Sequence, residues 1–181
     1  MDNGASSYRR YLSGDEDAFC HIVKEYFDSL VFFIHRFVQD YAAAEDIALD
    51  VFTQLVVHKH RYNFSVSLKT YLFMLGRSRA LDYLKRRRRL APLTEAEQLA
   101  SSQPTLEELL LADARKRALH DAMEQLDQTQ RLALHLVYFE GMTPEEAAKV
   151  LKKTKKQVYN LLYRGKAALR VILGKEGEQL L

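Results

Sequence analysis

The sequence predicts an all-α protein built from two small helical domains that are joined by a flexible acidic linker. Apolar residues recur every three or four positions over long stretches in both halves of the 181-residue chain, as they do on one face of an α-helix. Several expected helix starts carry a capping box, in which Ser or Thr is followed three residues later by Glu or Gln. A stretch with Pro92 and Pro104 but without clear periodicity separates the halves. We therefore expect domains at residues 1–90 and 108–181 and a linker at residues 91–107.

The N-terminal domain is expected to be a bundle of three to four helices. The first begins at a capping box of Ser13 and Glu16 and continues to Phe37 with the largest apolar stripe of the chain. The second runs from about Ala42 to Val57. Its expected inward residues are Ile47, Val51, Phe52 and Leu55. The third runs from near Ser67 to about Arg89, and its expected inward residues are Leu68, Tyr71, Leu72, Leu75 and Leu81.

The third expected helix ends in five consecutive basic residues, Lys85 to Arg89. Such a run alone is typical of a solvated helix end that complements the helix dipole. Here Arg77 and Arg79 extend the charge back along the helix. The basic residues alternate with aromatic ones, namely Tyr71, Phe73 and Tyr83. Guanidinium groups bind phosphates and rings stack on base faces, so this pattern indicates binding to unpaired nucleic acid.

The C-terminal domain is expected to hold four helices. A capping box of Thr105 and Glu108 begins a helix that ends near Gln125, and a second helix continues to Phe139, where Gly141 ends it. Two further starts follow in quick succession. Thr143, Pro144 and Glu146 begin a short helix to about Leu151, and Thr154 with Gln157 begins a longer one. This spacing predicts a helix-turn-helix.

Charge indicates what the helix-turn-helix contacts. Residues 149–170 hold eight basic residues and no acidic one, which is typical of a nucleic-acid-binding surface. The alternative for a charge run alone is a solvated amphipathic hairpin. On the longer helix, Val158, Leu161, Leu162, Gly165 and Leu169 share one face. The exposed face is expected to carry Lys156, Tyr159, Asn160, Tyr163 and Lys166.

Composition narrows the function further. The net charge is only +3, but residues 65–89 hold eight bases against one acid and residues 90–114 hold five acids and no base, which indicates separate partners for separate segments. No apolar run is long enough to span a membrane, and no secretion signal begins the chain, so we expect a cytoplasmic protein without direct membrane contact. The single cysteine, Cys20, is expected in the core.

An enzyme is not expected. His58 and His60 lack the carboxylate or cysteine partners of a metal site, and no nucleophile–base pair or phosphate-binding glycine loop stands out. We expect no metal and no cofactor.

The motifs resemble regions 2 and 4 of the extracytoplasmic-function (ECF) group of bacterial sigma factors. The region 2 resemblance rests on Ala44-Glu45-Asp46-Ile47, Asp50-Val51-Phe52, Tyr71-Leu72, Arg77 and Asp82-Tyr83-Leu84-Lys85-Arg86-Arg87. The region 4 resemblance rests on Leu126, Gln130-Arg131, residues 138–143, Glu146-Ala147-Ala148 and residues 158–164. Together they cover the chain from Gly14 to Leu173.

The resemblance implies that the chain directs core RNA polymerase to promoters and starts DNA melting. Region 2 would dock on the clamp helices of the largest subunit, through Asp46, Asp50, Phe52 and Gln54. It would bind the minus-ten element, partly as single strand, with the loop from His60 to Ser67 holding a flipped base. The residues implied there are Asn63, Tyr71, Arg77, Arg79, Tyr83, Lys85, Arg86 and Arg87.

Region 4 would bind the flap of the second-largest subunit and the double-stranded minus-thirty-five element. The residues implied for DNA are Lys155, Lys156, Gln157, Tyr159, Asn160, Tyr163, Arg164 and Lys166. The resemblance also leads us to expect an anti-sigma factor as a partner. The acidic linker would thread the RNA channel of the polymerase, where its glutamates mimic phosphates, or act as a simple tether.

The sequence departs from the family pattern at four positions: Leu49 replaces a clamp-facing glutamine, Tyr71 a tryptophan, Ser78 an asparagine and Lys152 the turn glycine. At Lys152, either the lysine adopts a positive φ at a cost near ~1 kcal/mol or the turn has another geometry.

Two other hypotheses remain beside the sigma factor. The first is an ordinary helix-turn-helix regulator whose N-terminal domain senses a ligand or dimerises. The basic helix end argues against it, because a sensor domain needs no second nucleic-acid surface. The second is a sigma-like decoy that captures anti-sigma factors without promoter activity, which could dispense with the basic recognition helix.

Overall fold

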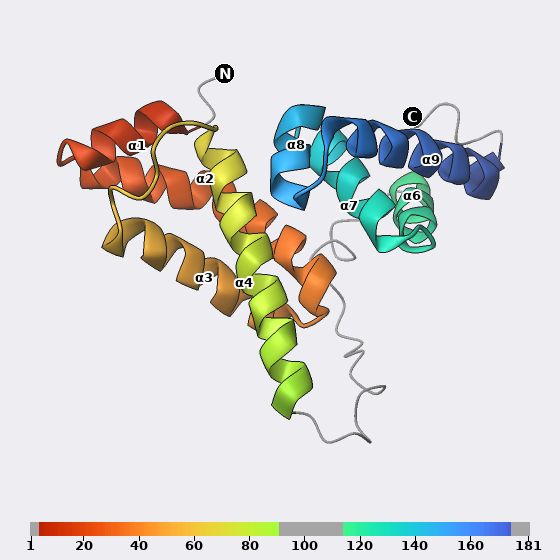
Figure 1. Cartoon of the computed structure of the whole chain (residues 1–181), viewed down its shortest axis with the longest axis horizontal. Helices are drawn as coiled ribbons and strands as arrows, with labels where there is room; N and C mark the ends of the chain where they lie inside the picture. Colours follow the sequence, from red (N-terminus) through yellow and green to blue (C-terminus); the bar gives the residue numbers. More distant parts are fainter. Residues whose placement is uncertain (1–3, 91–113, 175–181) are drawn as a thin grey trace. The chain divides into compact units, whose positions relative to one another are not determined.

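The computed structural model describes residues 4–90 and 114–174 of the chain. The chain forms two compact units, residues 1–101 and 102–181, and the described parts of both consist of helices and their connections (Figure 1). The predicted all-α fold is therefore confirmed. The linker expected at residues 91–107 and the capping box of Thr105 and Glu108 lie outside the described residues.

The first unit packs four helices: α1 (Ala5–Leu12), α2 (Glu16–Val38), α3 (Tyr41–Val57) and α4 (Leu68–Leu90). Helix α2 contacts the other three. Its large apolar side chains, among them Leu30, Phe33 and Ile34, are completely buried. Phe33 packs on Phe73 of α4, with 4.9 Å between ring centroids. The long apolar stripe of the sequence is thus the centre of this bundle.

Helix α1 and the start of α2 differ from the prediction. Ser13 does not cap α2. Its hydroxyl donates to the Arg10 carbonyl at 2.7 Å, at the end of α1. Asp15 is the N-cap of α2, and its carboxylate accepts from the Ala18 amide at 3.2 Å. Sequence patterns missed α1 because it has only eight residues and its buried face consists of two tyrosines.

Two expected core residues lie at the surface. Cys20 is exposed, because the buried positions of this part of α2 are Ala18 and Ile22. Leu81 is 38% exposed, whereas Gly76 and Ala80 of the same helix face the bundle. A Cβ at Gly76 would lie 2.8 Å from Cδ1 of Leu30, so the glycine allows α2 and α4 to approach closely.

The second unit contains α6 (Ala114–Glu124), α7 (Gln128–Leu134), the π-helix η1 (His135–Phe139), α8 (Pro144–Leu151) and α9 (Lys155–Leu173). The predicted helix end near Phe139 is correct, and Gly141, which was expected to end the helix, has a positive φ of 65°. The last turn is π-helical rather than α-helical: the Glu140 amide donates to the His135 carbonyl five residues earlier at 3.0 Å. The His135 and Glu140 side chains are both buried, with Nε2 of His135 3.2 Å from Oε1 of Glu140.

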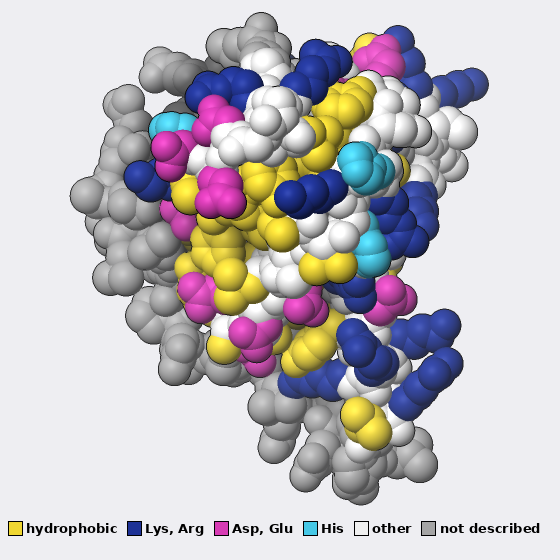
Figure 2. Space-filling view, turned by 90° about the vertical axis from the view of Figure 1, so that its left-hand side faces the viewer, with side chains coloured by type: hydrophobic (Ala, Val, Ile, Leu, Met, Phe, Trp, Pro, Cys, Tyr) yellow, Lys and Arg dark blue, Asp and Glu magenta, His cyan; other side chains and the backbone are white. Residues whose placement is uncertain are grey.

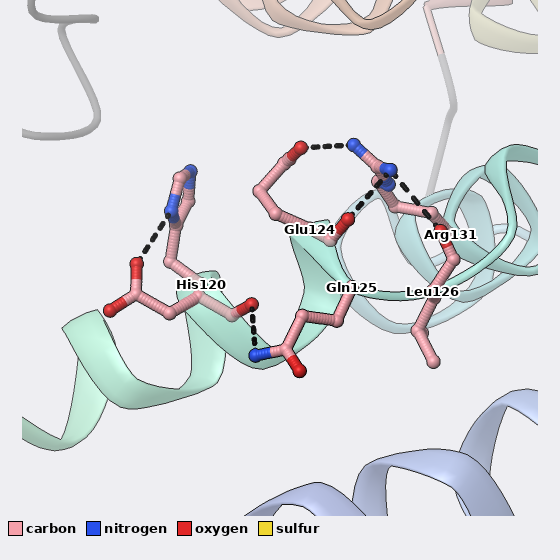
Figure 3. Close-up of polar contacts among 6 residues, drawn as sticks. His120, Glu124, Gln125, Leu126 and Arg131 are labelled. Atoms are coloured by element: carbon pink, nitrogen blue, oxygen red, sulfur yellow. Dashed lines mark hydrogen bonds and ion pairs between the residues drawn. The ribbon is translucent and has the colours of Figure 1, made fainter.

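Arg131 holds the junction between α6 and α7 (Figure 3). Its guanidinium forms an ion pair with the Glu124 carboxylate. It also donates to the backbone carbonyls of Glu124 and Leu126 at 3.0 and 3.2 Å. The first carbonyl ends α6 and the second lies just beyond it, where no further helical turn supplies a donor. Arg131, one of the residues that resemble region 4, therefore stabilises the pair of helices, α6 and α7, that packs against α9.

Candidate nucleic-acid and polymerase interfaces

Both helices of the helix-turn-helix begin with the predicted capping boxes. At α8, the Thr143 hydroxyl accepts from the Glu146 amide at 3.2 Å, and the Glu146 carboxylate accepts from the Thr143 amide at 3.0 Å. At α9, the Thr154 hydroxyl accepts from the Gln157 amide at 3.2 Å, and the Gln157 side-chain oxygen accepts from the Thr154 amide at 2.8 Å. Ala147 and Ala148 are buried, as expected where the helices pack.

The turn between α8 and α9 is closed by a lysine in the left-handed conformation. Lys152 has φ 52° and ψ 46°, and the amide of Lys153 donates to the Ala148 carbonyl at 3.0 Å. Of the two geometries considered for this position, the structure adopts the positive φ. The turn thus keeps the helix-turn-helix shape despite the absence of glycine.

Helix α9 has one buried and one exposed face, as its sequence predicts. Val158, Leu162 and Leu169 are at most 6% exposed, and Gly165 is buried against Leu134 of α7. The opposite face is exposed and carries Lys156, Asn160, Tyr163 and Arg164. A shallow hollow lies along its flank, lined by Lys153, Gln157, Asn160, Leu161 and Arg164.

Four of the expected contacts on α9 have partners within the unit, among them Tyr159, whose ring centroid lies 5.7 Å from the Lys155 ammonium. The Gln157 side-chain oxygen serves the α9 cap, so only its amino group remains to face a base. The Lys155 ammonium forms an ion pair with Glu145 of α8. The Lys166 ammonium lies over the Tyr138 ring, 4.4 Å from its centroid. The centre of the exposed face is therefore Lys156, Asn160 and Tyr163.

The basic end of α4 is free of the bundle. In Figure 1 the last turns of α4 extend beyond α2 and α3, and Lys85, Arg86, Arg88 and Arg89 are exposed. In Figure 2 basic side chains gather toward this end of the unit. Arg77 and Arg79 lie further back on the helix and are half-buried. Burial lowers the pKa of the Arg77 guanidinium from its ordinary value, but an arginine keeps its charge in proteins.

The aromatic residues of α4 are less accessible than expected. Phe73 is completely buried, so it stabilises the core and cannot stack on a base. Tyr71 is half-buried, and its ring packs against Tyr62 with 5.0 Å between centroids. Tyr83 is half-buried as well. Spacing alone could not separate these rings, because the buried residues of α4 all lie between Leu68 and Ala80, and residue type does not reveal where the helix leaves the bundle.

The loop at residues 58–67, which joins α3 to α4, has a defined conformation. The Asn63 side chain accepts from the Ser65 amide at 3.1 Å. The Tyr62 hydroxyl donates to the Val66 carbonyl at 2.6 Å. Between them Phe64 has a positive φ of 60°, which is unusual for an aromatic residue. Ser67 then begins α4, where its hydroxyl accepts from the Thr70 amide at 3.1 Å.

One face of α3 combines carboxylates with exposed apolar side chains. Asp46 and Asp50 are exposed, and Leu49 between them is 54% exposed. Val57, which the sequence analysis did not single out, is 66% exposed. Figure 2 shows such a mixture on one face of the protein, where acidic side chains border an apolar patch.

Phe52 does not belong to this exposed face. It is 4% exposed and packs between the rings of Phe19 and Phe27 of α2. The expectation that Phe52 contacts the polymerase directly does not fit this conformation, because the ring is part of the core. Gln54 is half-buried.

Within residues 4–90 and 114–174, no cluster of three or more His, Cys, Asp or Glu side chains could hold a metal ion. None of the helices in those ranges is both long and apolar enough to cross a membrane.

Comparison with known proteins agrees with this architecture. The model of "Sigma-70 region 2" matches residues 22–90 and the model of "Sigma-70, region 4" matches residues 116–169. The RNA polymerase sigma-H factor of Pseudomonas aeruginosa is 25% identical over 170 residues, which cover 88% of each chain. The ECF RNA polymerase sigma factor SigX of Bacillus subtilis is 23% identical over 161 residues, 86% of this chain and 83% of SigX. The sigma factor RpoE in its complex with the anti-sigma factor NepR, from Bartonella quintana, has a similar fold. Its TM-score is 0.70 at 18% identity, over 87% of this chain and 97% of RpoE.

The two matches together span more than half of the chain, in the order region 2 and then region 4. They define the class of protein: a sigma factor, which is a transcription initiation factor that acts with RNA polymerase. Within this class the chain belongs to the ECF group of the sigma-70 family, which has regions 2 and 4 joined by a linker.

Proposed function

We propose that this sigma factor holds a promoter at two places, with α9 on the minus-thirty-five element and the end of α4 on the minus-ten element. The observation that supports it is the presence of two exposed basic surfaces, one in each compact unit. A regulator with a single DNA-binding domain does not require a second basic surface. A decoy that only binds anti-sigma factors requires neither of the two basic surfaces.

On α9, Asn160 is the proposed base-reading residue. Its side chain is exposed at the centre of the face, and an asparagine amide pairs bidentately with adenine in the major groove. Lys156 lies beside it and is proposed to bind phosphate, which positions the helix without reading sequence. Gln157 can contribute only its amino group unless the α9 cap opens.

On the first unit, Lys85, Arg86 and Arg87 are proposed to follow the backbone of the opened minus-ten strand, with Arg77 and Arg79 further along α4. Asn63 in the 58–67 loop is proposed to contact a flipped base. Unstacking a base costs a few kcal/mol, which stacking and phosphate contacts offset. Tyr71 and Tyr83 are half-buried, so they can offer an edge of the ring to the strand.

The face of α3 that carries Asp46, Leu49 and Asp50 is proposed to dock on the clamp helices of the largest polymerase subunit, with Gln54 at its border. An apolar centre with charged neighbours is the ordinary composition of a transient protein interface. Region 4 is proposed to bind the flap of the second-largest subunit. The protein would act in the cytoplasm with the polymerase, and an anti-sigma factor would compete for these surfaces, as one binds the RpoE of similar fold.

The experiment measures the two DNA contacts separately. A promoter is first selected from a random DNA library with the holoenzyme. Affinities are then measured for a duplex with its upstream element and a single strand with its downstream element. Replacing Lys156 should weaken only the duplex, and replacing Lys85 and Arg86 together only the single strand. Equal losses on both probes for both variants would contradict the assignment of the two surfaces.

A further inference from the structure

Helix α1, which lies outside the motifs that resemble region 2, packs against the 58–67 loop through Tyr8. Tyr8 of α1 is completely buried. Its hydroxyl is placed between two backbone carbonyls, that of Leu55 at 3.1 Å and that of Lys59 at 2.8 Å. These carbonyls belong to the end of α3 and the start of the loop, where no further helical turn supplies a donor.

The contact persists over the whole physiological pH range. Burial raises the pKa of Tyr8 to about 12, so the phenol stays protonated and continues to donate. A deprotonated phenol would accept hydrogen bonds only and would face two carbonyl oxygens. The hydroxyl is therefore a fixed donor between α1 and the loop.

The ring of Tyr8 continues the support into the loop. It packs against Tyr62 at 5.5 Å and Phe64 at 6.2 Å between centroids. Tyr62 in turn packs against Phe64 at 4.6 Å and donates to the Val66 carbonyl. A second residue of α1 acts from outside: the Arg9 guanidinium lies 4.8 Å from the centroid of the Phe64 ring.

Phe64 is the point at which this support is needed. Its positive φ of 60° costs free energy for a residue with a Cβ. Such a conformation persists only where surrounding contacts enforce it. Arg9, Tyr8 and Tyr62 all contact the ring, and Asn63 is the neighbouring residue in sequence.

We propose that α1 sets the shape of the loop that accepts the flipped base, with Tyr8 as its positioning residue. The proposal rests on the proposed function of this loop and deepens it. Tyr8 does not touch DNA. It fixes Asn63 and Phe64 in place before the strand opens, so that a base enters a preformed site and little ordering of the loop remains to oppose binding.

The test measures how much the flipped base contributes to binding. Holoenzyme is titrated with the selected downstream single strand and with strands in which one base at a time is removed to leave an abasic sugar. For the wild type, one position should show a loss of about tenfold or more, as stacking of one base predicts. Tyr8→Phe should reduce that loss about three- to tenfold, without changing the affinity of the abasic strand.

The matched control is Tyr11→Phe. Tyr11 belongs to the same aromatic cluster, with its ring centroid 5.8 Å from that of Tyr8, but its hydroxyl donates to no residue that the structure describes. This variant should keep the wild-type ratio of intact to abasic affinity. A purely structural role of Tyr8 would lower the melting temperature but leave the ratio unchanged in the folded protein.

If Tyr8→Phe does not fold, Arg9→Ala takes its place, because Arg9 is exposed and not part of the core. The ratio should fall in Arg9→Ala and recover in Arg9→Lys, which keeps a cation over the ring. If the ratio of intact to abasic affinity is unchanged in Tyr8→Phe, or in Arg9→Ala where that variant is used, the proposed role of α1 is overturned, while the proposed function of the loop stands. If no position of the wild-type strand responds to base removal, the loop does not hold a flipped base, and the proposed function of the loop fails with it.

Discussion

The Lys155 ammonium and the Glu145 carboxylate form an ion pair that joins the first turns of α8 and α9. Lysine near the start of a recognition helix was expected to face DNA. Instead, its charge is directed toward another part of the helix-turn-helix. The hydrogen bond from Lys155 lowers the pKa of Glu145, and the same bond raises the pKa of Lys155. Because the pKa of the carboxyl is lowered and that of the ammonium is raised, the pair is complete at neutral pH. It is lost as the pH falls through the lowered value or rises through the raised one.

Glu145→Gln should raise the affinity of the protein for all DNA sequences to the same extent. The substitution removes a negative charge from the DNA-facing side and releases Lys155 for a phosphate. The slope of log K against log salt concentration should become steeper by about one. Fluorescence anisotropy with cognate and scrambled duplexes at several salt concentrations measures both effects. An increase for the cognate duplex alone would show that Glu145 takes part in base reading.

Asn160→Ala should weaken binding at one base position by about 1 to 3 kcal/mol and relax the preference there. Lys156→Ala, one turn earlier on the same face, is the matched control and should weaken all sequences uniformly. Competition binding with duplexes substituted at each position of the upstream element gives both profiles. A uniform loss for Asn160→Ala would remove its base-reading role.

Lys152→Gly should stabilise the second unit by about 1 kcal/mol, because glycine adopts the positive φ of this turn without strain. Lys152→Ala removes the same charge and keeps the strain, so the difference between the two variants isolates the backbone effect. Urea denaturation followed by circular dichroism measures it. If the glycine variant is no more stable than the alanine variant, the left-handed turn is not strained.

Leu49→Ser should weaken holoenzyme formation by about 1 kcal/mol or more while leaving stability unchanged, since the leucine is 54% exposed on the proposed docking face. Leu81→Ser is the control, an exposed leucine on another helix. Phe52→Ala should instead destabilise the first unit by about 3 to 5 kcal/mol, because it leaves a cavity in the core. Surface plasmon resonance with immobilised core polymerase and thermal unfolding separate the two effects. If Leu49→Ser binds core polymerase as tightly as the wild type, this face of α3 is not the docking surface.

Sequence patterns predicted the fold well where a helix has a cap and a single apolar stripe. Helices α8 and α9 are the clearest cases, since their two capping boxes agree with the expectation and the expected packing residues of α9 are buried except Leu161, which is half-buried. The patterns failed where a local signal had a tertiary competitor. Ser13 satisfies the spacing of a capping box, yet Asp15 is nearer to the helix and binds the Ala18 amide.

The candidate interfaces were predicted less completely, because residue type does not reveal what a side chain contacts. Phe52 and Phe73 have the character of contact residues, but both are buried. Glu145 and Lys166 are exposed or half-buried but already have partners, Lys155 and Tyr138. These partners belong to other helices, so sequence spacing does not reveal them. Tyr8 escaped notice because α1 has only eight residues and because the partners of Tyr8 lie about 50 residues away in the sequence, at Leu55 and Lys59.

Run-off transcription by core RNA polymerase, with and without this chain, tests the central claim most directly. The templates are the promoter selected by the holoenzyme and the same promoter with its upstream element scrambled. We predict discrete transcripts only when the chain is present, and a strong reduction on the scrambled template. Transcripts of equal amount without the chain, or a chain that does not bind core polymerase, would contradict its function as a sigma factor.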